Sequence, residues 1–242
     1  MALDLTDQQR AVGKANFNRT AEGLTRRGFM KSLVASGAAV AVATPAAYYG
    51  YKSITGNPVK AVLIGAGDEG GVLVGEHNPN YLEFLAVCDI RPSNMKRIFD
   101  GEPTGLRKGL KKVYGNRANN IKKLDSYDAF VDELRKNKDI EAVVIALPLC
   151  MHAKAAIDAM KIGKERGKPI HVLTEKLMAW NIKQCKQMIR TAKECGSILS
   201  VGHQRHYSLL YAHATEVINA GVLGDIRHIR ALWHRNFTWP FD

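Results

Sequence analysis

The stretch VKAVLIGAGDEG, residues 59–70, decides the fold of this 242-residue chain. Its first half is a short β-branched apolar run, which predicts a buried strand, and its second half fits the pattern Gly-x-Gly-x-x-Gly. A second apolar run, residues 84–88, leads into Asp89, which follows Gly70 by 19 positions. A glycine-rich turn that opens a helix after a strand, with an acidic residue at this distance, is typical of a dinucleotide-binding site.

Each glycine of this motif has a separate physical role. Gly65 permits the tight turn, Gly67 lets backbone amides approach a pyrophosphate, and Gly70 lets the helix pack close to the strand. The helix N-terminus supplies the positive pole for that anion. Asp89 would accept hydrogen bonds from the adenosine ribose hydroxyls, which favours NAD, whereas Arg91 could pair with a 2′-phosphate and keeps NADP as the second choice. The alternative is a glycine turn and a helix-capping aspartate with no ligand.

Two carboxylates in the same loop oppose an anionic ligand. Asp68 and Glu69 would repel a pyrophosphate by simple Coulomb repulsion. That repulsion is avoided only if the two side chains point to solvent or reach lysine side chains.

Downstream, strand-length apolar runs alternate with helix-length segments. The runs predict strands over residues 59–64, 84–88, 142–147, 169–173 and 197–201, and helices over 92–99, 125–136, 152–164 and 181–194. Residues 100–122 are rich in Gly and Lys and predict a surface excursion. Fully apolar strands separated by helices indicate a parallel sheet covered on both faces. We therefore expect an α/β, doubly wound parallel sheet, a Rossmann domain over residues 58–202.

The pattern changes after Gly202. Residues 207–220 predict one amphipathic helix closed by Gly221, and residues 226–233 alternate as an exposed-sheet strand would. About 40 residues are too few to form a self-sufficient domain. We interpret residues 203–242 as the beginning of a C-terminal α+β substrate domain, most of which the chain lacks.

The segment TRRGFMK, residues 25–31, resembles a twin-arginine export signal and is followed by an uncharged run of Ala, Val and Gly over residues 32–49. This run has no polar face, which argues against an amphipathic or buried helix. The resemblance implies that residues 1–47 are a signal and linker, and that the twin-arginine machinery is a partner. The mature protein would then be exported, periplasmic or otherwise extracytoplasmic, and tethered to the membrane if the signal stays uncut.

Composition excludes several other classes. The chain carries 35 Lys and Arg against 23 Asp and Glu, a formal charge of +12, and the basic residues are scattered along it. No nucleic-acid-binding module is recognisable, so we expect no nucleic-acid partner. The four cysteines form no Cys-x-x-Cys pair and no ligand spacing, so we expect neither a disulfide framework nor a metal site.

Polar residues follow the later predicted strands as well, at the sheet edge where ligands bind in open parallel sheets. Together with the glycine loop they make the sequence similar to the Gfo/Idh/MocA family, the glucose-fructose oxidoreductase and inositol dehydrogenase group. The resemblance covers about residues 58–242. The motifs that carry it are the glycine loop with Asp89, Pro148-x-x-x-His152, Glu175-Lys176, Gly202-x-Gln204-Arg205 and Leu223-Gly224-Asp225-Ile226.

The resemblance implies a role for each matching residue. Lys176 would touch the nicotinamide ribose and the substrate hydroxyl, and would help to move the hydroxyl proton. A partly buried lysine with a lowered pKa suits that task, and a solvated surface lysine is the alternative. Glu175 would orient Lys176 or bind the nicotinamide ribose. Pro148 and His152 are further cofactor-binding candidates, although His152 could instead merely cap the following helix.

Other candidate residues lie further along the chain. Arg205 and His206 could bind a sugar or carboxylate group, or could only make interdomain contacts. Leu177 replaces the proline usual in the family, which leaves the backbone at Lys176 less constrained. The family's Asp and His catalytic partners lie in the second domain, beyond residue 242. Family sheets commonly pair through their open faces, which implies a homo-oligomer.

Three functions are compatible with these features. The first is an exported NAD(P)-dependent oxidoreductase that transfers a hydride between a nicotinamide cofactor and a sugar or polyol hydroxyl. The second is a truncated, non-catalytic dinucleotide-binding module. The third is an NAD-dependent glycosidase, which would retain its cofactor, return it to its starting redox state and release a sugar.

Overall fold

The computed structural model describes residues 57–103, 105, 107–232 and 234, and these fall into two units. The first unit comprises residues 57–203 and the second begins at residue 204. The predicted export signal and linker, residues 1–47, lie outside the described residues. Within the described part of the chain, no helix combines the length and apolar character that a membrane span requires.

The first unit is built on one six-stranded sheet in which every neighbouring pair is parallel. Its strands are β1 (Val59–Ile64), β2 (Leu82–Cys88), β3 (Lys122–Leu124), β4 (Ala142–Ile145), β5 (His171–Glu175) and β6 (Leu199–Gly202). The spatial order β3-β2-β1-β4-β5-β6 is that of a doubly wound dinucleotide-binding fold, so the predicted fold class is confirmed.

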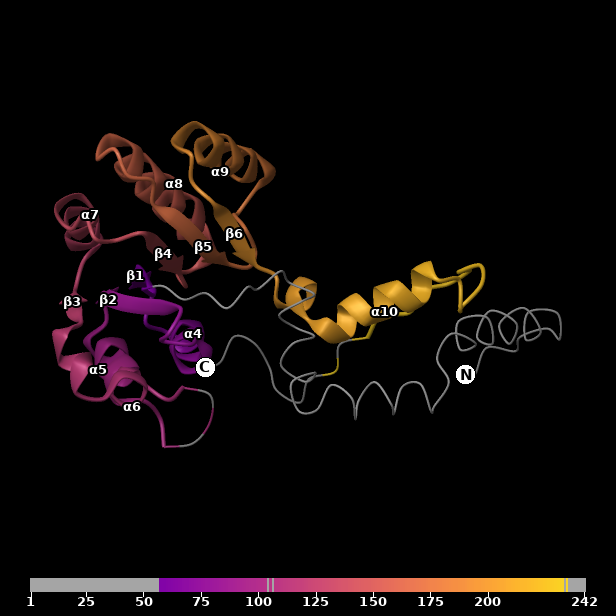
Figure 1. Cartoon of the computed structure of the whole chain (residues 1–242), viewed down its shortest axis with the longest axis horizontal. Coiled ribbons are helices and arrows are strands. Elements are labelled where there is room, and N and C mark those ends of the chain that lie inside the picture. Colours follow the sequence, from indigo (N-terminus) through magenta and orange to yellow (C-terminus); the bar gives the residue numbers. More distant parts are fainter. Residues whose placement is uncertain (1–56, 104, 106, 233, 235–242) are drawn as a thin grey trace. The chain divides into compact units, whose positions relative to one another are not determined.

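Helices cover both faces of the sheet (Figure 1). The helical segments are α4 (Asp68–Glu76), α5 (Pro92–Asp100), α6 (Leu110–Tyr114), the 3-10 helix η1 (Gly115–Asn120), α7 (Tyr127–Lys136), α8 (Leu149–Glu165) and α9 (Ile182–Cys195). Helices α4, α5 and α6 share one apolar core with the sheet, and α7, α8 and α9 share the other. The β1 strand supplies alternate side chains to both cores, which explains why its buried residues 61–64 are all apolar.

The predicted surface excursion over residues 100–122 is wrong in its second half. There α6 and η1 pack against the sheet and bury Leu110, Tyr114 and Ala118. The segment escaped prediction because single buried residues separated by Gly and Lys give no helical period. The β3 strand was missed for a similar reason, since only Leu124 of its three residues is buried.

The second unit contains the 3-10 helix η2 (Gln204–Tyr207) and α10 (Leu209–Asn219), which confirms a helix near residues 207–220. No residue of α10 is buried. The strand predicted over residues 226–233 is wrong over 226–232, which are not in a strand, while Trp233 lies outside the described residues. An alternating sequence forms a strand only where another strand completes its hydrogen bonds, and in the described part no strand pairs with it.

The histidine that ends α4, His77, is enclosed by hydrogen bonds. The His77 Nδ1 lies 2.8 Å from the Val74 carbonyl, so Nδ1 donates, and Nε2 accepts from the Tyr114 hydroxyl at 2.7 Å. The same hydroxyl accepts from the Phe84 N–H at 3.1 Å. Burial lowers the pKa of His77 from its ordinary 6.5, against the raising effect of the contact with Val74.

We expect acid to destabilise the fold through His77. Its folded-state pKa is lowered, so its contribution to the free energy of unfolding is complete above pH 6.5 and is lost as the pH falls through the lower folded-state value. Urea midpoints at about pH 7.5 and about pH 5.5 should differ less in His77→Gln than in the wild type. An unchanged difference in His77→Gln would contradict the assignment.

Candidate functional site

The carboxyl ends of the central strands meet at one edge of the sheet. Ile64 of β1 is paired with Ile145 of β4, and Glu175 of β5 is paired with Gly202 of β6. The chain continues from β1 toward β2 on one side and from β4 toward β5 on the other, so the strand order reverses between β1 and β4. In open α/β sheets such a switch point is where ligands bind.

The turn after β1 has the glycine requirements that its sequence predicts. Gly65 has φ +99°, and a Cβ on it would lie 2.2 Å from the Ala146 carbonyl oxygen. A Cβ on Gly70 would lie 2.1 Å from the Gly65 carbonyl oxygen, so both close approaches are to backbone. A Cβ on Gly67 would meet nothing within 4 Å. Gly65 and Gly70 are therefore needed by the fold, whereas Gly67 borders open space.

This open space lies at the N-terminus of α4. Gly67 is the N-cap residue of the helix, and no side chain caps it. The first N–H groups of a helix have no partner within the helix and carry its positive partial charge, so they suit an anion. The turn therefore fits the pyrophosphate of a dinucleotide, with Gly67 leaving room for it.

Asp89, directly after β2, is held firmly beside this turn. Its Oδ2 accepts from the Ala66 N–H at 2.8 Å and its Oδ1 from the Arg91 N–H at 2.7 Å. The Asn94 side-chain amide on α5 donates to both oxygens, at 3.4 and 3.2 Å. Asn94 was not identified from the sequence, where its only signal is a position five residues after Asp89. These contacts fix the orientation of a carboxylate that could accept hydrogen bonds from the vicinal hydroxyls of a ribose.

Two arginines neutralise one carboxylate of the acidic loop. Asp68 Oδ1 lies 2.9 Å from Arg97 Nη1 and 3.7 Å from Arg107 Nη2, and Arg107 Nε donates to the Asp68 carbonyl at 3.1 Å. Arg107 also pairs with Glu102 at 3.0 Å. The Asp68 charge is thus neutralised by arginine rather than by the lysine considered from the sequence. Neither arginine was singled out there.

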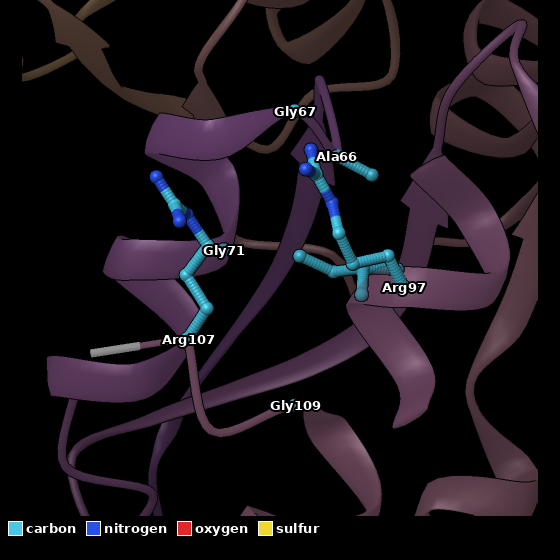
Figure 2. A pocket seen from close by; sticks show the side chains of 7 residues that line it. Ala66, Gly67, Gly71, Arg97, Arg107 and Gly109 are labelled. Carbon is cyan, nitrogen blue, oxygen red and sulfur yellow. The ribbon is translucent and has the colours of Figure 1, made fainter. Parts of the chain in front are cut away.

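These two arginines line a small hollow beside the glycine turn, and Figure 2 shows both side chains next to the first turns of α4. Arg97 comes from α5 and Arg107 from the segment before α6, so tertiary packing alone brings them together. The hollow is lined by Ala66, Gly67, Gly71, Arg97, Ile98, Arg107 and Gly109.

Glu175, the last residue of β5, is buried at the same edge. Its Oε2 accepts from the Lys176 N–H at 3.1 Å, and a Cβ on Gly202 of the neighbouring strand would lie 2.9 Å from its Oε1. Burial raises the pKa of the Glu175 carboxyl, against the lowering effect of the Lys176 N–H, and the negative charge of Glu69 adds to the rise. The start of α4 and the end of β5 therefore influence each other electrostatically.

Lys176 begins the turn that follows β5, and its side chain is exposed. Exposure differs from the partial burial expected, because the turn extends beyond the last residue of the strand. The peptide bond between Lys176 and Leu177 is cis.

His152, from α8, is 2% exposed and contacts the Leu177 carbonyl. Pro148 is the N-cap residue of α8, so His152 does not cap that helix.

The remaining candidates belong to the second unit. Arg205 and His206 lie on η2, both exposed, and the Arg205 guanidinium stacks over the Tyr211 ring at 5.4 Å. Their predicted substrate role stays a prediction. In the described residues, no group of three or more His, Cys, Asp or Glu side chains is arranged to hold a metal ion.

Comparison with known proteins agrees with this geometry. Residues 59–203 match the family model described as "Oxidoreductase family, NAD-binding Rossmann fold". A 1-carboxy-3-chloro-3,4-dihydroxycyclo hexa-1,5-diene dehydrogenase of Comamonas testosteroni is 34% identical over 109 residues, 45% of this chain and 26% of that protein. A glycosyl hydrolase family 109 protein of Shewanella sp. (strain MR-4) is 24% identical over 174 residues, 70% of this chain and 35% of that protein. The chain thus spans about a quarter to a third of these relatives.

Solved structures share the fold. Scyllo-inositol dehydrogenase from Lactobacillus casei, with bound NAD(H) and scyllo-inositol, has a TM-score of 0.52 at 18% identity, covering 69% of this chain and 43% of that one. KijD10, a 3-ketoreductase from Actinomadura kijaniata in complex with NADP and TDP-benzene, has a TM-score of 0.52 at 23% identity, covering 71% and 45%. Both likenesses concern the architecture of the chain.

Proposed function

The chain belongs to the oxidoreductase family with an NAD-binding Rossmann fold, and from this premise we propose that it binds NAD and transfers a hydride between the nicotinamide and a hydroxyl of a sugar or polyol. The observation that carries the proposal is the open, uncapped start of α4 at Gly67 beside the firmly held Asp89 carboxylate. Solved proteins of the same architecture that hold NAD(H) with scyllo-inositol, or NADP with a nucleotide ligand, support this class of ligand.

Different residues of the proposed site bind different parts of the dinucleotide. The N–H groups at the start of α4 bind the pyrophosphate, and Gly67 leaves them accessible. Asp89 accepts hydrogen bonds from the adenosine ribose hydroxyls. Its negative charge would repel a 2′-phosphate, which is why we propose NAD rather than NADP. The exposed Arg91 side chain is the group that would favour NADP.

The turn after β5 supplies the proton chemistry. A bound nicotinamide supplies the hydride acceptor or donor. Removing hydride from an alcohol carbon is easier when the hydroxyl proton leaves at the same time, and we assign the uptake of that proton to the neutral amine form of Lys176. Glu175 would either orient Lys176, whose N–H it accepts, or bind the nicotinamide ribose.

Calorimetric titration of the purified protein with NAD and NADP tests this proposal. We expect saturable binding, tighter for NAD. A folded, monodisperse protein that binds neither nucleotide would overturn the proposal, since the site would then lack its ligand. Binding without nicotinamide reduction, across a panel of sugars and inositols, would instead favour a non-catalytic dinucleotide-binding module.

Replacing Asp89 by alanine should weaken NAD more than NADP. The wild-type carboxylate attracts the ribose hydroxyls of NAD and repels the extra phosphate of NADP, and its removal ends both effects. Each charge-assisted hydrogen bond contributes about 1.5–3 kcal/mol, so NAD affinity should fall at least about tenfold. The ratio of the two affinities is the readout, because disturbance of the Ala66 and Arg91 contacts weakens both nucleotides alike. An unchanged ratio would contradict the ribose role of Asp89.

A second candidate is an NAD-dependent glycosidase. Similarity to a glycosyl hydrolase family 109 protein over 70% of this chain favours it. The two activities differ in the redox state of the cofactor after turnover. Sugar release from a glycoside, with nicotinamide absorbance unchanged at the end of the reaction, would select the glycosidase; stoichiometric reduction of NAD by a free sugar or polyol would select the dehydrogenase.

We also propose export through the twin-arginine route and assembly into a homo-oligomer. The support for export is the motif at residues 25–31 with its uncharged run, and for the oligomer it is the pairing of open sheets in related proteins. Export would place the protein in the periplasm or another extracytoplasmic compartment, tethered to the membrane if residues 1–47 stay attached. Cell fractionation of the wild type and an Arg26→Lys, Arg27→Lys double variant tests export, and light scattering tests the oligomer.

A further inference from the structure

His152 is a fully enclosed polar side chain at the functional edge of the sheet. It lies on the first turns of α8 with 2% of its surface exposed. Nδ1 lies 2.8 Å from the Leu177 carbonyl oxygen, and Nε2 lies 2.8 Å from the Leu147 carbonyl oxygen. One ring therefore joins the turn after β4 to the turn after β5.

This arrangement leaves the ring no surface for a ligand. Both nitrogens face backbone oxygens, and the ring is enclosed, so a direct contact with a nicotinamide would require both contacts to break. Carbonyl oxygens only accept hydrogen bonds and a neutral imidazole carries a single N–H, so a neutral ring donates to only one of the two carbonyls. A buried polar group whose hydrogen bonds are satisfied makes the surrounding structure more rigid, so it fixes the relative position of the two segments that it joins.

We propose that His152 is a positioning residue that fixes the Lys176 turn through the Leu177 carbonyl. The proposal rests on the proposed function, because Lys176 is the group whose placement gains from it. Lys176 has a long, exposed side chain, so its reach toward a substrate depends on a fixed backbone. A proline at position 177 would restrict the backbone through its fixed φ, which leucine does not. The hydrogen bond from His152 to the Leu177 carbonyl restricts the backbone there instead.

Two variants separate the two contacts of the ring. In His152→Asn the side-chain amide nitrogen lies close to the position of Nδ1, and in His152→Gln the longer side chain carries its amide nitrogen to the position of Nε2. With the proton on Nδ1, His152→Asn should thus keep the donor for Leu177, whereas His152→Gln should lose it and place its donor at Leu147 instead.

Hydrogen exchange of the backbone amides is the readout, and it needs neither cofactor nor substrate. In His152→Gln, exchange over residues 176–180 should become about tenfold faster, which corresponds to one lost hydrogen bond, while residues 146–149 stay protected. In His152→Asn residues 176–180 should stay as protected as in the wild type. His171→Gln is the matched control, because the half-buried His171 accepts from the Ile198 N–H at the opposite end of β5. It should alter neither turn.

A measurement on the wild-type protein keeps the proposal testable if both variants fail to fold. Nitrogen-15 NMR of the imidazole should show a proton on Nδ1 of His152. An unprotonated Nδ1, or equal exchange of the 176–180 segment in the two variants, would overturn the positioning role. Calorimetry with NAD tests the proposed function separately, so a failure of one result is distinguishable from a failure of the other.

Discussion

Replacing Gly70 by alanine should lower the melting temperature of the protein by about 8 °C. The added Cβ would lie 2.1 Å from the Gly65 carbonyl oxygen, and a backbone atom cannot move aside as a side-chain end can. Overpacking costs about 1–3 kcal/mol, and contact with a backbone atom puts this case at the upper end of about 3 kcal/mol. The gain of about 1 kcal/mol in helix propensity from glycine to alanine leaves a net loss of about 2 kcal/mol. NAD binding should be lost with it, because the turn and the start of α4 move apart.

Gly67→Ala is the matched variant three positions earlier. There the added Cβ would meet nothing within 4 Å, and φ is −71°, so alanine fits the backbone. Its melting temperature should stay close to that of the wild type, with at most about 1 kcal/mol lost at the N-cap. The methyl group nevertheless occupies the open space at the helix start, so NAD affinity should fall at least about tenfold.

The pair of variants separates folding from binding. Thermal unfolding and calorimetry on both proteins should give an unstable protein for Gly70→Ala and a stable, weakly binding protein for Gly67→Ala. If Gly67→Ala bound NAD as tightly as the wild type, the pyrophosphate would not lie at the start of α4. If Gly70→Ala melted at the wild-type temperature, the helix would not depend on its close approach to Gly65.

The sequence predicts most of the architecture because its strands are short, apolar and bounded by recognisable turns. The β1, β2, β4, β5 and β6 strands all lie within or close to the predicted runs, and the Ser126 side chain caps α7 by accepting from the Ala129 N–H at 3.2 Å. Each of these features depends on neighbours in sequence. The β3 strand and α6 lack such local signals, since contacts distant in sequence determine them.

The same distinction applies to the site. The glycine positions and Asp89 follow from a spacing that the backbone geometry imposes, so they were predictable. Arg107 reaches Asp68 from 39 positions away, and no local pattern predicts that pairing. The sequence makes His152 a candidate, but its burial and its contact with Leu177, 25 positions on, are visible only in the fold.

The largest expected effect on turnover is that of Lys176→Met. Methionine has nearly the same length and keeps the apolar stem, but it can neither take nor give a proton. General acid–base catalysis contributes about 10²–10⁴-fold to rate, so hydride transfer should slow by that order. NAD affinity should change little, because the proposed pyrophosphate and adenosine contacts are at Gly67 and Asp89. Single-turnover reduction of NAD by the most active polyol of the panel, followed by nicotinamide absorbance, is the measurement.

Two further variants show whether the slower turnover of Lys176→Met comes from lost proton transfer or from lost positive charge. Lys176→Arg keeps the positive charge but holds its proton at neutral pH, so it should be nearly as slow as Lys176→Met if proton transfer is the role. If the charge alone mattered, for example by attracting the substrate, the arginine variant would keep most of the rate. Lys183→Met, at an exposed position on α9, removes a similar charge elsewhere and should turn over at the wild-type rate. Wild-type turnover in Lys176→Met would remove Lys176 from the mechanism, because no compensating change in binding could hide a lost proton relay in a single turnover.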